Sequence, residues 1–312
     1  MTVRTLKEVP GLGGLYAKAV LPSGGKKGRA KAPEELEFST LEVPDVPVPC
    51  DRDDAMRIFV GGRPAEEAFF GHLHSLLMPL QMELMTQPKF PLPMMGLIHT
   101  TNTWRQLRPV PLDSEVDLQV TVAEFRPHRV GTEVLLVSQV LIDGQVAAEE
   151  ETTYLAKGVK LDGLGEALEA VRPEFETPMP TALWKLDSDT GREWAKLSGD
   201  INPIHINPLL AKGLGMPGMI AHGMYTASRA LSECDVQPGT SWSFDIEFAA
   251  PVVLPTKVPV AITRAGVGAG GVGGGAAGAG ARTGDIGDYD VVAWHGKKKR
   301  PHFTGRVRKL IG

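Results

Sequence analysis

The sequence predicts an α+β protein built from two copies of one unit, each a helix followed by an antiparallel sheet that curls around it. Two observations predict this. In the first half a long apolar helical segment precedes alternating, β-branched segments, and a helix-containing region followed by strands recurs in the second half. The 312 residues also suffice for two domains of about 150 residues. We expect one unit over residues 1–165 and another over residues 166–312.

The first strong helical signal runs from Pro64 to about Met85. Pro64 suits the first position of a helix, and acidic residues follow it in the first turn. Leucine and phenylalanine recur at helical spacing around much of the circumference, which predicts a helix buried on several sides. Pro79 in the interior predicts a kink.

Extended segments follow this helix. Residues 95–110 are rich in β-branched side chains, and residues 114–125 alternate so that their valines share one face. Residues 132–156 contain Asp143-Gly144, a pair typical of a tight hairpin turn. We therefore expect an antiparallel meander after the first helix.

The second half repeats this order after a charged, glycine-containing linker at residues 157–176. Residues 107–122 resemble residues 248–263, since each stretch carries a Pro-Val pair, a leucine, a short polar turn and an alternating strand. The matching order of elements supports an internal repeat. Strands of the second half are expected at residues 242–248, 257–263, 289–294 and 302–310.

Composition excludes several classes of function. With 33 basic and 37 acidic residues, the net charge of −4 argues against a nucleic-acid-binding protein. No apolar run approaches the roughly 20 residues of a membrane helix, and the N-terminal segment lacks the pattern of a secretory signal. Cys50 and Cys234 are far apart and lack metal-ligand spacing. We expect a soluble, cytoplasmic protein without a membrane partner.

Three low-complexity or basic segments leave alternatives open. The chain through about Glu34 mixes Gly, Pro and Lys, which favours a loosely held, solvated arm over a basic patch for a phosphate-bearing substrate. Residues 297–300 favour a charged hairpin turn over phosphate recognition. Residues 266–280 contain a G-x-G-x-x-G spacing, but the glycines that follow favour a flexible loop over a dinucleotide site.

The most informative stretch lies between residues 189 and 233. Ser188 or Asp189 can cap a short helix over residues 191–197, which Ser198-Gly199 ends. Proline at positions 203 and 208 then predicts a rigid loop instead of regular helix. This loop holds the side chains of Asp200, Asn202 and His205, and we expect Asp200 and His205 to converge on one water molecule.

A second helix is expected to begin near Gly223. Glycine at a helix start lets another group approach the backbone, and the N–H groups of the first turn have no intrahelical acceptor. With the positive end of the helix dipole behind it, the N–H of Gly223 is a candidate site for a carbonyl oxygen.

These parts suit reversible water addition to an α,β-unsaturated thioester. The thioester carbonyl needs a hydrogen-bond donor, the β-carbon needs an activated water, and the α-carbon needs a proton. Asp200 and His205 would supply the acid–base pair, Asn202 would orient them, and Gly223 would hold the carbonyl oxygen.

The string SGDINPIH, followed by a helix that opens with HGM, resembles the hydratase motif of the MaoC-like family, which includes R-specific enoyl-CoA hydratases and 3-hydroxyacyl-thioester dehydratases. The resemblance implies two fused hot-dog units, each a long helix wrapped by a curved antiparallel sheet. It implies that Asp200 and His205 are the catalytic pair, that Asn202 supports them and that Gly223 forms the oxyanion hole. We add Ser198, His222 and Met224 as substrate-binding residues, with His222 orienting the site instead of acting as its base.

The first half lacks an S-G-D-x-N-P-x-H string, so the resemblance gives it a role in completing the acyl-chain tunnel. The implied reaction belongs to fatty-acid metabolism and needs no cofactor or metal. The thioester carrier would be CoA or acyl carrier protein, and a homodimer is compatible with this organisation. A non-catalytic acyl-thioester-binding protein and a hot-dog thioesterase are the alternatives, whereas a serine-hydrolase elbow has no matching string.

Other histidines are weaker candidates. His72 and His74 lie on the first long helix, where packing or surface positions are favoured over function. His99 and Asn102 could face the tunnel, but a satisfied polar pair in the core is the favoured interpretation.

Overall fold

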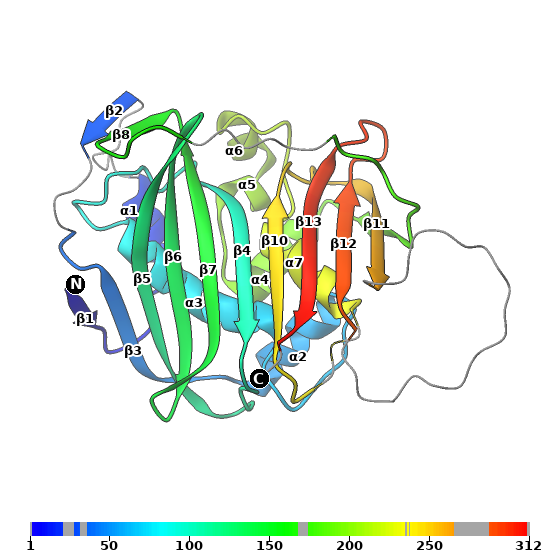
Figure 1. Cartoon of the computed structure of the whole chain (residues 1–312), viewed down its shortest axis with the longest axis horizontal. Helices are drawn as coiled ribbons and strands as arrows, with labels where there is room; N and C mark the ends of the chain where they lie inside the picture. Colours follow the sequence, from blue (N-terminus) through cyan, green and yellow to red (C-terminus); the bar gives the residue numbers. More distant parts are fainter. Residues whose placement is uncertain are drawn as a thin grey trace, which may run out of the picture.

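The structure, a computed structural model, describes residues 2–20, 28–31, 36–167, 174–234, 236, 238–264 and 287–310; the glycine-rich residues 266–280 lie outside them. Its described strands form one eleven-stranded sheet and one two-stranded pair, and the helices lie on one face of the large sheet (Figure 1). The neighbouring strands are, in order, β1 (Val3–Thr5), β3 (Thr40–Pro47), β5 (Glu115–His128), β6 (Gly131–Ile142), β7 (Gln145–Lys157), β4 (Ile98–Gln106), β10 (Trp242–Phe248), β13 (Pro301–Lys309), β12 (Tyr289–Trp294), β11 (Thr256–Arg264) and β9 (Ala182–Leu186). The separate pair is β2 (Gly28–Lys31) and β8 (Val159–Asp162).

Two helix-plus-sheet units share this sheet. The first-half strands end at β4, and β4 pairs antiparallel with β10, the first of the neighbouring second-half strands. The long helix α3 lies against the first-half strands and α7 against the second-half strands (Figure 1). The described helices are α1 (Leu12–Val20), α2 (Cys50–Phe59), α3 (Phe70–Met85), α4 (Thr190–Ser198), α5 (Pro203–Ile206), α6 (Pro208–Gly213) and α7 (Gly223–Ser232).

Helix α3 is buried on all sides, as its apolar circumference predicted: every residue except Glu83 is buried, and the helix continues through Pro79 to Met85. It begins at Phe70, so the expected start at Pro64 was wrong. The backbone before it is bound elsewhere, since the N–H of Ala68 donates to the carbonyl of Val110 at 2.7 Å.

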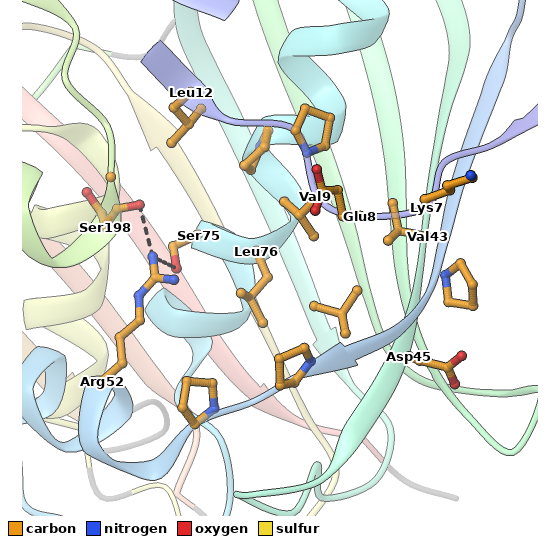
Figure 2. Close-up of a pocket in the computed structure, with 17 residues that line it drawn as sticks. Lys7, Glu8, Val9, Leu12, Val43, Asp45, Arg52, Ser75, Leu76 and Ser198 are labelled. Atoms are coloured by element: carbon orange, nitrogen blue, oxygen red, sulfur yellow. Dashed lines mark hydrogen bonds between the residues drawn. The ribbon is translucent and has the colours of Figure 1, made fainter. Parts of the chain in front are cut away.

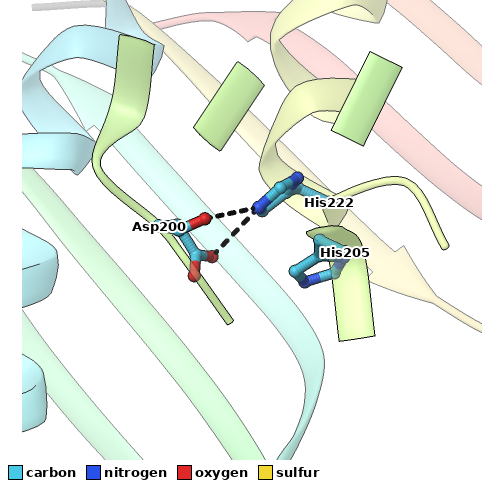
Figure 3. Close-up of side chains that lie close together, drawn as sticks. All are labelled: Asp200, His205 and His222. Atoms are coloured by element: carbon cyan, nitrogen blue, oxygen red, sulfur yellow. Dashed lines mark hydrogen bonds and ion pairs between the residues drawn. The ribbon is translucent and has the colours of Figure 1, made fainter. Parts of the chain in front are cut away.

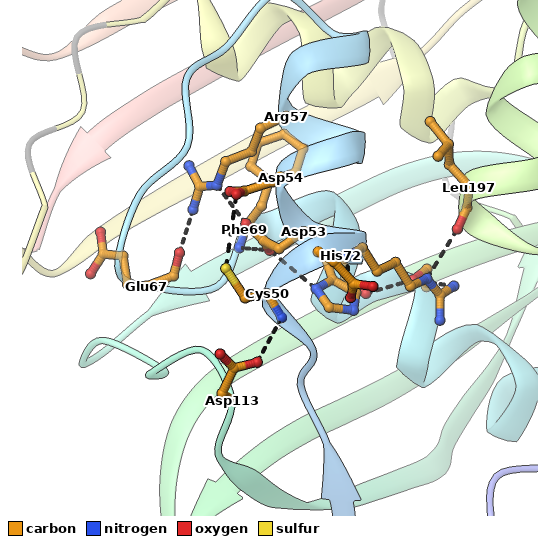
Figure 4. Close-up of polar contacts among 12 residues, drawn as sticks. Cys50, Asp53, Asp54, Arg57, Glu67, Phe69, His72, Asp113 and Leu197 are labelled. Atoms are coloured by element: carbon orange, nitrogen blue, oxygen red, sulfur yellow. Dashed lines mark hydrogen bonds and ion pairs between the residues drawn. The ribbon is translucent and has the colours of Figure 1, made fainter.

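The start of α3 is fixed by a buried carboxylate on α2. Asp53 accepts from the backbone N–H of Phe69 at 2.6 Å and from the Arg57 guanidinium at 2.6 Å, and its Oδ1 lies 3.1 Å from His72 Nδ1 (Figure 4). The N-cap residue of this helix, Phe69, makes no side-chain cap bond. The side chain of Asp53 instead accepts a hydrogen bond at the start of the helix. His72 is fully buried and belongs to the packing of the helix, as favoured.

Most expected strands are present. Residues 242–248 and 289–294 match β10 and β12, β11 and β13 differ by one residue at their ends, and Asp143-Gly144 joins β6 to β7 with positive φ at both residues. Residues 296–298 form the expected charged turn between β12 and β13. The expected linker contains the short strand β8.

The N-terminal segment departs from the expected loosely held arm. Residues 12–20 form α1, and Leu15, which is 2% exposed, packs with Met78 and Met82 of α3. An ion pair of 3.0 Å between Lys18 and Glu83 adds to this contact. The expectation was wrong for these residues. Their apolar side chains do recur at helical spacing, but the neighbouring glycines made a helix difficult to recognise from the sequence.

Among the described residues, no helix is both long and apolar enough to cross a membrane.

Candidate active site

Asp200, His205 and His222 come together on the helix side of the sheet (Figure 3). Asp200 follows α4, His205 lies in α5, and His222 immediately precedes α7. One nitrogen or oxygen atom from each side chain lies within 4.8 Å of the other two. The structure therefore brings the two residues of the predicted acid–base pair together and adds a second imidazole.

The chain between α4 and α5 has a local reason for its shape. Gly199 ends α4 with a φ of 79°, a left-handed conformation that favours glycine. Pro203 then occupies the first position of α5, and the side chain of Asn202 caps that helix by accepting from the N–H of Ile204 at 3.3 Å. The expectation that residues 200–205 contain no helix was therefore wrong for residues 203–205, which belong to α5. Proline is compatible with the first position of a helix, so Pro203 begins this turn.

His205 has a fixed tautomer. Its Nδ1 lies 2.8 Å from the carbonyl oxygen of Ile220, and because a carbonyl can only accept, Nδ1 carries the hydrogen. Burial, together with the neighbouring His222, lowers the pKa of His205 to about 3. At neutral pH the ring is uncharged and Nε2 carries a lone pair.

His222 contacts both of the other two residues. Its Nε2 donates to the backbone carbonyl of Asp200 at 2.9 Å, and its ring stacks on that of His205 with 3.7 Å between centroids and 25° between planes. Burial also lowers the pKa of His222, and its buried Nδ1 has no hydrogen-bond partner among the described residues. The orienting role expected for His222 is compatible with these contacts and stays a prediction.

The carboxylate of Asp200 is ionised. Burial favours its neutral form, but His222, His205 and a hydrogen bond from the hydroxyl of Tyr16 outweigh burial and lower the pKa of Asp200. Its Oδ1 accepts from Tyr16 and from the backbone N–H of Asn202 at 3.1 Å, whereas Oδ2 lies 3.7 Å from His222 Nε2. The side chain remains 21% exposed, so a small molecule can reach it.

Gly223 opens α7, and as a first-turn residue its N–H has no acceptor within the helix. A Cβ at this position would lie 3.1 Å from Cε1 of Phe248 on β10. The ring therefore packs against the glycine, and a side chain at this position would require a small displacement of the ring. No motif or spacing in the sequence singles out Phe248.

Two further predicted residues have mainly structural contacts. The Ser198 hydroxyl donates to the carbonyl of Trp194 at 2.9 Å and accepts from the N–H of Asp200 at 3.2 Å. Met224 is 6% exposed and packs in the core. Their assignment to substrate binding stays a prediction, and Ser198 helps to place Asp200 through its backbone.

The polar residues of the first half form a second cluster, close enough to the first for Asp200 to act on the pKa of His99. His74 Nδ1 and Asn102 Nδ2 each lie 2.6 Å from Oε1 of the fully buried Glu150. His99 is not paired with Asn102 as favoured; its Nε2 donates to the carbonyl of Thr101 at 3.1 Å. The His99 ring lies 4.9 Å from that of Phe248, and burial lowers its pKa to about 4.

A mainly apolar pocket of about 490 Å³ reaches the chain just before Asp200, although Asp200, His205 and His222 do not line it (Figure 2). Its wall includes Gly199, which directly precedes Asp200, and residues of α3, β3 and the segment around α1. The Arg52 guanidinium at this wall donates to Ser75 at 3.1 Å and to the carbonyls of Leu197 and Ser198 at 3.0 and 3.2 Å. Arg52 thus satisfies the last carbonyls of α4, where a cation also complements the helix dipole.

The cluster of Asp200, His205 and His222 has the composition of a metal site. However, Nε2 of His222, the nitrogen nearest Asp200, carries a hydrogen and donates it to a backbone carbonyl. The cluster thus offers a metal ion fewer lone pairs than its composition suggests, and the chemistry below uses only side-chain and backbone groups.

A carboxylate and a neutral imidazole gathered with the residue that precedes α7, on paired helix-plus-sheet units, are the features of a hot-dog protein with a hydratase-type site. Comparison with known proteins agrees: residues 168–277 match the model of the "MaoC like domain". The 3-hydroxyacyl-thioester dehydratase X of Mycobacterium tuberculosis is 31% identical over 278 residues, covering 89% of this chain and 91% of that protein.

The crystal structure of HtdX from the same organism has a TM-score of 0.70 and 28% identity, covering 87% of this chain and 100% of that chain. A shorter match, 40% identical over 74 residues, covers 22% of this chain and 4% of the fatty acid synthase subunit beta of Saccharomyces cerevisiae. The chain belongs to the MaoC-like dehydratase family, and it is a hydro-lyase with two hot-dog units.

Tyr16 is the main site residue that sequence reasoning missed. It lies 184 residues from Asp200 along the chain, and no local pattern links the two. Only the folded contact of α1 with α3 brings its hydroxyl to the carboxylate.

Proposed function

We propose that the protein interconverts (3R)-3-hydroxyacyl and trans-2-enoyl thioesters in fatty-acid metabolism, with Asp200 and His205 as the acid–base pair. The observation that carries this proposal is the convergence of an ionised carboxylate and the lone pair of a neutral imidazole beside the first turn of α7. The names of the dehydratase relatives support the class of substrate.

The resting protonation state suits this reaction. In hydration, the water oxygen bonds to the β-carbon, the pair removes one water proton, and the α-carbon gains one proton. Water loses one proton and the α-carbon gains one, so the numbers of protons removed and added are the same. Asp200 and His205 are therefore unprotonated both before and after the reaction. Dehydration runs the same steps backwards: a proton leaves the α-carbon and departs with the β-hydroxyl as water.

The thioester carbonyl oxygen becomes more negative as the water oxygen bonds to the β-carbon in hydration, and as the α-carbon loses its proton in dehydration. We assign its stabilisation to the N–H of Gly223, with the α7 dipole behind it. Asn202 contributes through its backbone N–H, which donates to Asp200 Oδ1, and through its side chain, which caps the helix that carries His205. His222 fixes the carbonyl of Asp200 and the plane of the His205 ring.

We assign acyl-chain binding to the first unit, residues 1–165, and the chemistry to the second, residues 166–312. The pocket beside Gly199 supports this division because its walls are mainly apolar and come largely from the first half, including Leu76 and Pro79 of α3. An acyl chain extending from a thioester at Asp200 would bury apolar surface there.

The test follows a trans-2-enoyl-CoA by loss of its enone absorbance while free thiol is titrated in parallel. Hydration without thiol release supports the proposal. Thiol release would indicate a thioesterase, and binding without either reaction would indicate an acyl-thioester-binding protein. Repeating the assay with the acyl group on acyl carrier protein identifies the preferred carrier.

A further inference from the structure

Helix α1 contributes a side chain to the site although it lies outside the hydratase motif. The hydroxyl of Tyr16 donates to Oδ1 of Asp200. The ring is held in place because Leu15 is buried against Met78 and Met82, while Lys18 pairs with Glu83 at 3.0 Å. Tyr16 is therefore positioned by the packing of α1 on α3.

The two oxygens of Asp200 have different surroundings. Oδ1 accepts from the Tyr16 hydroxyl and from the N–H of Asn202, so its lone pairs are directed to fixed donors. Oδ2 faces the imidazole of His222 at 3.7 Å, a separation longer than a hydrogen bond. The carboxylate is held at one oxygen, which leaves the other for a reacting water or hydroxyl.

The Tyr16 hydroxyl keeps its proton. Burial raises its pKa above the usual range, and the negative charge of Asp200 raises it further. A phenol that does not ionise at any working pH can donate a hydrogen bond but cannot act as the base of the reaction. Its contribution must pass through Asp200.

We propose that Tyr16 is a positioning residue for the Asp200 carboxylate, holding Oδ1 so that Oδ2 is presented to the substrate. This inference rests on the proposed function in one respect, namely that Asp200 reacts. It makes α1, a segment that precedes both sheet-forming units, a part of the functional site.

The test compares the wild type with Tyr16→Phe, which keeps the ring and its packing but removes the hydroxyl. A hydrogen bond to a charged group is strong enough that its loss should lower kcat about tenfold, with KM nearly unchanged. Because Asp200 loses a donor that favours its ionised form, the acidic limb of the kcat–pH profile should move to higher pH.

Tyr225→Phe is the matched control, since the Tyr225 hydroxyl accepts from Arg229 at 3.1 Å and makes no contact with Asp200 among the described residues. It should leave both the rate and the acidic limb as in the wild type. An unshifted limb in Tyr16→Phe would overturn the proposal. Faster turnover would also overturn it, because Tyr16 would then be blocking the carboxylate.

A second measurement separates this inference from the proposed reaction. Carbon-13 NMR can follow the titration of the Asp200 carboxyl without substrate, with Asp200→Asn used for assignment. Tyr16→Phe should raise the pKa of Asp200, and an unchanged pKa would contradict the positioning role. If the wild type hydrates no enoyl thioester, the proposed function fails, while this titration still decides whether Tyr16 holds Asp200.

Discussion

Each half of the molecule holds a carboxylate beside a histidine, but the two carboxylates differ in exposure and in their hydrogen bonds. In the first half, Glu150 is fully buried, and its oxygens accept from His74, Asn102 and Gln81 at 2.6, 2.6 and 3.1 Å. In the second half, Asp200 is partly exposed, and only its Oδ1 is bound by close donors.

The comparison shows that residue types alone do not identify a site. Burial opposes ionisation of both carboxyls, yet neighbouring groups lower the pKa of each. The difference lies in access and in hydrogen bonding: both oxygens of Glu150 accept from buried protein donors, whereas Asp200 Oδ2 and His205 Nε2 have no such donor at hydrogen-bond distance among the described residues. The cluster around Glu150 connects α3 to the sheet, and we propose that the cluster around Asp200 carries out the reaction.

Loss of the proposed acid–base pair should have the strongest effect on turnover. Asp200→Asn and His205→Gln should each lower kcat by about a thousandfold or more, because each removes one member of the acid–base pair. Circular dichroism should show the fold unchanged. Near-normal rates in both variants would remove these residues from the mechanism and leave the two clusters equivalent.

Glu150→Gln should show the opposite pattern. Breaking a buried, hydrogen-bonded pair with His74 should lower the free energy of unfolding by about 3 kcal/mol, while turnover per folded molecule stays near that of the wild type. Urea denaturation measures the first quantity and the enone assay the second. Glu124→Gln, at an exposed ion pair with Arg126, is the control and should change stability by less than about 0.5 kcal/mol.

A thousandfold loss of turnover in folded Glu150→Gln would contradict the distinction drawn between the two clusters.

Gly223→Ala tests the carbonyl site. The added methyl would meet the Phe248 ring at 3.1 Å, and displacement of either group should lower kcat about tenfold. Combining it with Phe248→Leu, which makes room, should restore part of the rate. Equal losses in the single and double variants would show that the close contact with Phe248 is not the cause.

A further prediction concerns how the free energy of unfolding depends on pH. Burial lowers the pKa of His205 to about 3, whereas an unfolded histidine titrates near 6.5. Between these values the unfolded state binds the extra proton, so this histidine lowers the free energy of unfolding as pH falls, by about 1.4 kcal/mol per unit.

His205→Gln should therefore be less sensitive to acid than the wild type when urea denaturation is compared at about pH 7 and about pH 5. An identical loss of stability in both proteins would show that His205 does not stay neutral in the folded state.

Local patterns predicted the local features well. Alternation identified β10 and β12, and the spacing of proline, glycine and polar residues placed Asp200 and His205 in one turn. The turn in the chain between α4 and α5 is set by Gly199 and Pro203, so its geometry is encoded within a few residues.

Features that depend on distant contacts could not be predicted in this way. The start of α3 is set by Asp53 on another helix, and Tyr16 reaches Asp200 across 184 residues. Neither contact leaves a periodicity or a spacing in the sequence. The glycine content around residues 11–14 also weakened the helical pattern of α1.

The most direct test is a crystal structure of Asp200→Asn with a bound 3-hydroxyacyl-CoA. We expect the substrate hydroxyl within about 3 Å of both the residue 200 side chain and His205 Nε2, and the thioester oxygen at a similar distance from the N–H of Gly223. A thioester bound away from the first turn of α7, or a hydroxyl that reaches only one of the two side chains, would contradict it.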